Sequence, residues 1–149
     1  MSDVPLSQTL IGTWRLVSRE DRTASGERRV DPALGAEPIA LLVYDRGGNF
    51  AAQFMKRDRR AAAAVTAAAP GPNNSRAVGG YDAYFGSYTV DDAAGTVTQQ
   101  LVGALSPENL GRVLTRTMRV SGDELVIQLD TAGEDGTPIV RTLRWTRAA

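Results

Sequence analysis

The sequence predicts an all-β fold, a single antiparallel up-and-down β-barrel of eight or nine strands formed by residues 1–149. Short runs with strand-like alternation follow one another, and most are joined by turns of hairpin length. The first run opens with Gly12-Thr13-Trp14, and the last run closes with Arg147. A tryptophan in this position can plug one end of such a barrel, with an arginine lying over its ring.

The first predicted strand covers residues 10–19. Successive side chains of a strand point to opposite faces. Trp14, Leu16 and Ser18 are therefore expected to share one face, and Arg19 is expected to point to the other.

Three further strands are expected in the first half, at residues 27–30, 39–44 and 50–56. A turn at 24–27 and a loop at 31–38, which holds two prolines and a glycine, separate them. The sequence Asp-Arg-Gly-Gly-Asn at 45–49 is typical of a hairpin turn.

One short Ala-rich helix is expected near residues 58–69. Asp58 can cap its start, residues 61–69 are nearly all alanine, and Pro-Gly-Pro at 70–72 ends it. A helix of alanines has little side-chain area with which to dock, so we expect a mobile lid or rim element of the barrel here.

Five strands are expected in the second half, at residues 84–90, 96–105, 112–120, 125–130 and 139–147. Leu125, Ile127 and Leu129 alternate with other residues and form a core stripe. Leu143 and Trp145 share one face of the last strand in the same way.

Several segments resemble one protein family. Residues 12–18, Gly-Thr-Trp-Arg-Leu-Val-Ser, are similar to the opening of the lipocalin-like domain family, small calycin-type β-barrels of bacteria and fungi. Residues 81–91, Tyr-Asp-Ala-Tyr-Phe-Gly-Ser-Tyr-Thr-Val-Asp, carry the most specific part of the resemblance, which covers nearly the whole chain. The resemblance implies a barrel with an internal cavity and does not imply one reaction.

The chain departs from the family at two places. Members often carry a histidine where this sequence has Gln99-Gln100, so an imidazole role at that point does not carry over. The Ala-rich stretch at 61–69 also looks unlike the family.

Composition excludes several classes of function. The chain has 17 basic and 17 acidic residues, and so lacks the overall positive charge typical of a nucleic-acid-binding protein. It has no cysteine and no histidine, which excludes disulfides, thiolate catalysis, Ser-His-Asp triads and haem or metal centres held by these residues. The acidic residues show no calcium-loop pattern. We therefore expect no metal and no cofactor.

The expected partner is a small-molecule ligand or substrate, with neither nucleic acid nor membrane involved. No apolar stretch approaches the roughly 20 residues that span a bilayer. The first residues lack a basic start followed by an apolar run, so the expected location is the cytoplasm. We expect a monomer or a homodimer.

Two features at the barrel ends have alternative interpretations. Trp14 is either a plug that touches no ligand or a floor on which a ligand stacks. The basic stretch Lys56-Arg57-Asp58-Arg59-Arg60 is either the solvated start of a helix or an attractor for an anionic ligand or a carrier protein at the mouth.

Polar residues at strand centres are candidates for an internal site because buried polar groups need partners. One of Gln99 and Gln100 must face the interior. Arg116 lies either on the outer face or inside, where it would anchor a carboxylate, enolate or phenolate. Glu20 and Asp82 are candidate bases if burial or a charged partner tunes them.

Two functions from different classes fit these residues. The first is binding of one small hydrophobic or aromatic molecule inside the barrel. The alternative is a cofactor-independent isomerase or cyclase acting on a polyketide- or terpenoid-like intermediate, in which a tyrosine or arginine stabilises an enolate or phenolate. The candidate catalytic residues are Tyr84, Arg116 and Asp82. The candidate ligand-binding residues are Tyr44, Gln53, Met55, Phe85, Tyr88, Gln99 and Trp145.

Overall fold

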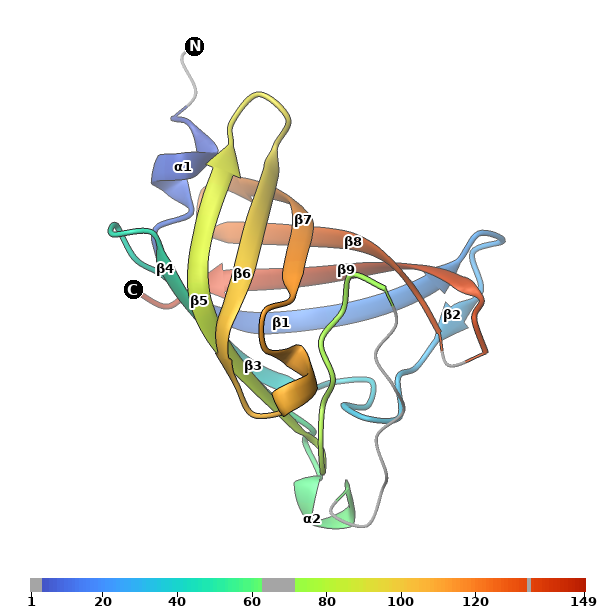
Figure 1. Cartoon of the computed structure of the whole chain (residues 1–149). Helices are drawn as coiled ribbons and strands as arrows, with labels where there is room; N and C mark the ends of the chain where they lie inside the picture. Colours follow the sequence, from blue (N-terminus) through green and yellow to red (C-terminus); the bar gives the residue numbers. More distant parts are fainter. Residues whose placement is uncertain (1–3, 63–71, 134) are drawn as a thin grey trace.

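The first strand pairs with the last, and this pairing closes an antiparallel sheet into a barrel (Figure 1). The computed structural model describes residues 4–62, 72–133 and 135–149. Its strands are β1 (Gly12–Thr23), β2 (Arg28–Arg29), β3 (Ile39–Tyr44), β4 (Asn49–Met55), β5 (Tyr81–Asp91), β6 (Thr96–Ala104), β7 (Val113–Ser121), β8 (Glu124–Ala132) and β9 (Pro138–Arg147).

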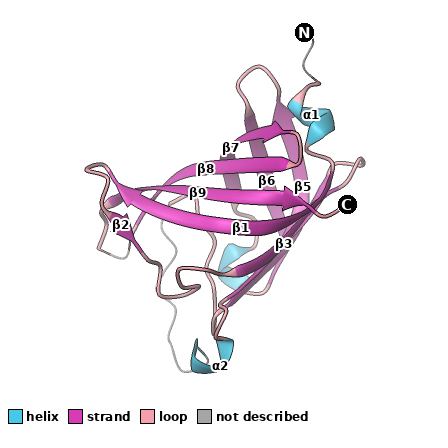
Figure 2. Ribbon diagram, turned by 180° about the vertical axis from the view of Figure 1, so that it is seen from behind, coloured by secondary structure: helices cyan, strands magenta, loops and turns pink. Residues whose placement is uncertain are grey.

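Neighbouring strands of the barrel follow chain order, from β3 through β9, with β1 between β3 and β9. The two-residue strand β2 lies outside this ring and pairs with the far end of β1 (Figure 2). The prediction of an antiparallel up-and-down barrel is therefore confirmed, as eight barrel strands and one extra strand.

Helices are few and short in the described part of the chain. They are α1 (Leu6–Thr9), α2 (Arg59–Ala62) and the 3-10 turn η1 (Pro107–Asn109). Of the helix expected at 58–69, α2 is the portion described, and residues 63–69 lie outside the described residues. None of the described helices has the length and apolar character needed to cross a membrane.

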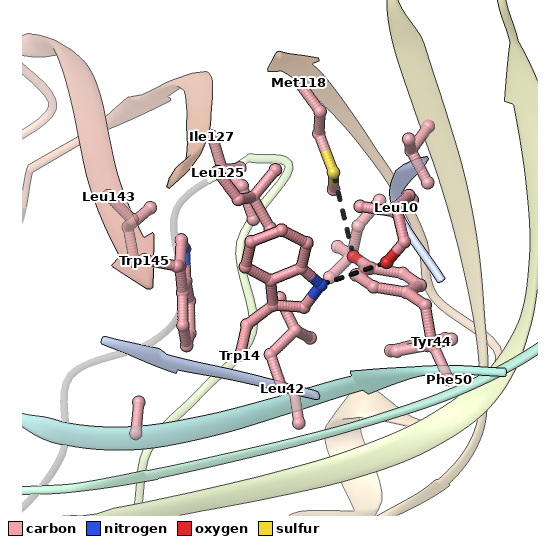
Figure 3. Packing of buried hydrophobic residues seen from close by; sticks show 14 of the residues in the cluster. Leu10, Trp14, Leu42, Tyr44, Phe50, Met118, Leu125, Ile127, Leu143 and Trp145 are labelled. Atoms are coloured by element: carbon pink, nitrogen blue, oxygen red, sulfur yellow. Dashed lines mark hydrogen bonds between the residues drawn. The ribbon is translucent and has the colours of Figure 1, made fainter. Parts of the chain in front are cut away.

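The α1 helix and Trp14 seal one end of the barrel (Figure 3). The Trp14 indole is fully buried, and its Nε1 donates a hydrogen bond of 3.0 Å to the carbonyl oxygen of Leu10. Leu6 and Leu10 pack against the same core. Trp14 therefore acts as the plug that the sequence indicated.

The expected facing of β1 is wrong beyond Leu16. The register with β9 shifts between Leu16 and Ser18, which is a β-bulge, and Val17 is the extra residue. The bulge reverses the alternation, so Ser18 is exposed and Arg19 is buried. Asp21, whose facing was not predicted from the sequence, is buried as well, so two charged side chains of β1 enter the interior.

Candidate functional site

An interior pocket lies in the half of the barrel that holds β1 beyond the bulge. Its empty volume is about 610 Å³, which includes space open to solvent, and the centre of a water molecule can move through about 60 Å³ of it. Its apolar lining residues are Leu34, Leu42, Phe54, Ala77, Ile127, Leu129, Leu143 and Trp145. The small volume favours a small ligand.

Trp145 is buried in the pocket wall, with 1% of its surface exposed. Its Nε1 donor has no hydrogen-bond partner among the described residues, whereas the corresponding donor of Trp14 has one. The two tryptophans lie close together in the core but play different parts (Figure 3). Trp14 closes the barrel and does not line the pocket, while Trp145 lines it and keeps a buried donor without a partner among the described residues.

Asp82 is the acidic residue placed deepest in this pocket, with 3% of its surface exposed. Its Oδ2 accepts a hydrogen bond of 2.6 Å from the Ser75 hydroxyl, and its Oδ1 has no partner in the described part of the chain. Burial raises the pKa of Asp82 to about 6, against the opposing effect of the hydrogen bonds from Ser75 and the Ala83 backbone. Its carboxyl can therefore both hold and release a proton near neutral pH.

Arg116 lines the same pocket and is buried, which settles its orientation as inward. Its Nη1 donates to the backbone oxygen of Asn73 at 2.6 Å and to the side-chain oxygen of Asn73 at 3.0 Å. No carboxylate lies within ion-pair distance of Arg116 in the described residues. Burial lowers the pKa of Arg116, yet a guanidinium stays charged at neutral pH.

The aromatic residues divide between the pocket and the core around it. Tyr84 lines the pocket, and burial raises its pKa while the nearby charge of Arg116 opposes that rise. Gln99 also lines the pocket and donates from Nε2 to the hydroxyl of Tyr44, which lies behind it in the core. Tyr88 packs edge-on against Tyr44, with ring centroids 4.9 Å apart, and does not line the pocket.

Three of the predicted ligand-binding residues lie on the outside of the barrel wall. Phe85 is 56% exposed because Tyr84, the residue before it, faces inward. Gln53 and Met55 line a separate hollow on the outer side of β3 and β4. The structure therefore brings together Tyr84, Arg116, Asp82, Gln99 and Trp145, and leaves these three residues out of the interior pocket.

A buried ionic network at the mouth was missed by the sequence analysis. Asp21 accepts hydrogen bonds from Arg141 Nε at 2.9 Å and Arg141 Nη2 at 3.2 Å, and Arg19 Nη2 lies 3.5 Å from it. Arg19 also bonds Asp31 at 3.0 Å. Burial alone would raise the pKa of Asp21, but the hydrogen bonds and charges of Arg141 and Arg19 outweigh it and lower the pKa.

One of these residues had a signal in the sequence. Arg141 is in phase with Leu143 and Trp145, so simple alternation places it inside. Arg19 and Asp21 had no such signal, because the bulge that turns them inward does not change the alternation of residue types.

Residues 72–78 form a strap across the pocket mouth, shown in green in Figure 1. The backbone oxygen of Pro72 accepts from Thr131 at 2.7 Å, Asn73 bonds Arg116, and Asn74 accepts from Arg141 at 3.0 Å. The strap thus forms hydrogen bonds with β7, β8 and β9. Its Ser75 hydroxyl also donates a hydrogen bond to Asp82 on β5.

The assembled site can bind a largely apolar molecule and recognise oxygen atoms on it. Its lining combines apolar and polar side chains. Of its arginines, Arg19 and Arg141 are paired with carboxylates and Arg116 is not, among the described residues, and Asp82 is the proton-exchanging group. No group of three or more acidic residues suited to a metal ion is found among the described residues.

The model of a family described as a lipocalin-like domain matches residues 11–148. None of the curated proteins matches the sequence.

Proposed function

Because the chain belongs to the lipocalin-like domain family, we propose that it binds a small, flat, largely apolar molecule inside the barrel. A lipocalin-like barrel suits ligand binding in a cavity in general. The finer statement, that the ligand is hydrophobic or aromatic and carries a polar oxygen, is supported by the residues of this pocket.

The observation that carries the proposal is a pair of buried polar atoms without partners on two residues that line one pocket. Trp145 Nε1 and Asp82 Oδ1 are both buried without a hydrogen-bond partner among the described residues. Leaving a buried polar group unpaired costs roughly 1–3 kcal/mol. A ligand that supplies an acceptor to the indole and a donor to the carboxylate would offset both costs.

Arg116 adds a preference for an acidic or strongly polarised oxygen on the ligand. A buried guanidinium without a carboxylate partner attracts a phenolate, an enolate or a carboxylate more strongly than a neutral group. A small planar aromatic compound with a hydroxyl group suits the apolar part of the lining and these polar groups together.

Titration with 2-naphthol tests this proposal. We expect its binding to change the intrinsic fluorescence of the protein through Trp145, and 2-methylnaphthalene, which has the same shape without the hydroxyl, to bind about 10-fold more weakly. The Trp145→Phe variant should lose the response. If 2-naphthol and 2-methylnaphthalene bind equally, or neither binds, the proposed recognition is wrong. Native mass spectrometry of the purified protein then looks for the natural ligand as a retained mass.

A second candidate function is favoured by Asp82, whose pKa of about 6 suits a general base at neutral pH. The Asp82 carboxylate would take a proton from the carbon beside a carbonyl group of the bound molecule. The resulting enolate oxygen would be stabilised by Arg116 and the Tyr84 hydroxyl. Return of the proton to a different carbon would move a double bond, which is an isomerisation without a cofactor.

An assay with a simple β,γ-unsaturated cyclic ketone separates the two candidates. An isomerase converts it to the conjugated ketone, which absorbs in the ultraviolet. Under the enzyme hypothesis, Asp82→Asn and Tyr84→Phe lose turnover but keep ligand binding. Unchanged turnover in both variants would remove their catalytic roles, and no turnover with binding intact would leave binding as the function.

A further inference from the structure

A hollow on the outside of the barrel is wider than the interior pocket. The centre of a water molecule can move through about 460 Å³ of it. It lies where β1, β3 and β4 meet, and Leu16, Ala40 and Phe54 form its base.

The hollow exists because β1 and β3 separate. They pair over four residues, from Gly12 opposite Tyr44 to Arg15 opposite Leu41, and no further pairs follow. Beyond that point β1 bulges and continues along β9, while Ala40 pairs with β4 alone. Figure 2 shows β3 leaving β1 at an angle. The alanine at this place fills little of the opening.

Although the hollow opens to the outside, the residues at its base have side chains that face the barrel interior. Ala40 is buried, and its cross-strand neighbour Phe54 lines both the hollow and the interior pocket. The Phe54 ring packs edge-on against Trp145, with centroids 5.8 Å apart. The Phe54 side chain therefore borders both spaces.

The rim combines apolar and cationic groups. Ile39 is 45% exposed and Leu41 is 38% exposed, which leaves apolar surface at the edge of the hollow. Arg15 and Arg57 stand at the same edge, and neither forms an ion pair with a described residue. The Arg57 Nε donates to the backbone oxygen of Glu37 at 3.2 Å, which holds that guanidinium in place.

No acidic side chain is present among the described residues that line the hollow. Arg59 adds a further positive charge near the hollow. Its guanidinium carbon lies 5.2 Å from the ring centroid of Tyr81, and Tyr81 lines the hollow. An apolar base beneath arginines without acidic partners complements a molecule that is apolar at one end and anionic at the other.

We propose that this hollow is a second binding site, which takes apolar carboxylic acids by placing the apolar part against Phe54 and the carboxylate between Arg15 and Arg57. In this proposal, the basic stretch at residues 56–60 attracts the anionic ligand to the hollow. Binding here does not require the interior pocket to be occupied.

The test uses naphthalene-2-carboxylate as the probe and naphthalene-2-methanol as its neutral counterpart. Two-dimensional NMR of the amide groups locates each probe. We expect the carboxylate to shift the amides of Leu41 and Gln53 on the hollow, and the R15Q/R57Q double variant to weaken carboxylate binding about 10-fold or more, while binding of the alcohol changes by less than about 2-fold.

The R46Q/R119Q double variant is the matched control, because it removes two exposed arginines that do not line the hollow. It should bind the carboxylate as the unaltered protein does. Equal weakening in both double variants, shifts confined to interior residues, or carboxylate binding that survives R15Q/R57Q would each overturn the proposal. Binding of 2-naphthol measured in the same variants reports the interior pocket separately, so the two sites can fail independently.

Discussion

The guanidinium carbon of Arg147 lies 4.2 Å from the ring centroid of Trp14. The same side chain donates from Nη1 to the backbone oxygen of Ile11 at 3.0 Å and from Nη2 to that of Thr9 at 2.8 Å. One residue of the last strand thus fixes both the plug and the end of the helix that covers it.

Replacing Arg147 should therefore open the sealed end. Arg147→Met keeps the apolar stem and loses the cation–π contact and both hydrogen bonds, so we expect a loss of about 2–3 kcal/mol in the free energy of unfolding. Chemical denaturation measures it. Arg144→Met, at an exposed position with an ion pair of 3.7 Å, should cost no more than about 1 kcal/mol. Equal costs would mean that Arg147 has no special role.

The buried network at the mouth predicts a large effect of Asp21→Asn. That change leaves Arg19 and Arg141 without their shared carboxylate, and breaking a buried ion pair typically costs about 3–5 kcal/mol. Glu20→Gln removes an exposed acid next to it, paired with Arg22, and should change stability by less than about 1 kcal/mol. Thermal unfolding of the two variants beside the unaltered protein checks the difference.

The lowered pKa of Asp21 also predicts that the protein loses stability at acidic pH. Its folded-state pKa is lowered from 3.8, so its stabilising effect is present above about pH 4 and disappears as the pH falls through the lower folded pKa. Unfolding of the Asp21→Asn variant should lack this part of the acid dependence. If the free energy of unfolding fell equally at acidic pH in both proteins, Asp21 would not be the source of this acid dependence.

The raised pKa of Asp82 predicts the opposite dependence of stability on pH. Its folded pKa of about 6 lies above the ordinary 3.8, so the folded state holds the proton more tightly, and this contribution is lost as the pH rises from about 4 to about 6. The rise of this pKa from 3.8 to about 6 corresponds to a loss on the order of 3 kcal/mol relative to Asp82→Asn. Denaturation from pH 4 to pH 7 gives this difference, and carboxyl NMR of Asp82 gives the pKa directly.

We expect two glycines of the β5–β6 pair to differ in how well they tolerate substitution by alanine. A Cβ on Gly86 would clash with the backbone oxygen of Gln100, so Gly86→Ala must push the strands apart at a bulge, and we expect a loss above about 3 kcal/mol or failure to fold. A Cβ on Gly103 would clash with the exposed Phe85 ring, and that ring can swing into solvent. Gly103→Ala should cost less than about 1 kcal/mol. Soluble yield and denaturation compare them.

Alternation of side chains predicted much of the fold and part of the site. It predicted that one of Gln99 and Gln100 faces the interior, and in the structure Gln99 does. It left the facing of Arg116 open, and the structure buries Arg116 in phase with Leu114 and Met118. These residues lie where β6 and β7 pair without a break in register, so the facing of one residue determines the facing of the next.

The rest depended on interactions that the pattern of residue types does not contain. The bulge at Val17 depends on how β1 meets β9, at the other end of the sequence, so Arg19 was assigned to the wrong face and Asp21 was left out. The strap at 72–78 reads as a turn-rich loop, and its place over the mouth follows from bonds such as Asn73 to Thr115 and Asn74 to Arg141.

The seam between β1 and β9 bears on how the protein is made. It joins Trp14 to Arg147 and Thr23 to Ile139, so the first barrel strand has no partner on that edge until the last strand leaves the ribosome. Nascent chains that expose an unpaired strand edge are prone to self-association. Contacts this distant in sequence also slow folding, so this barrel should depend on chaperones during synthesis more than a helical protein of the same length.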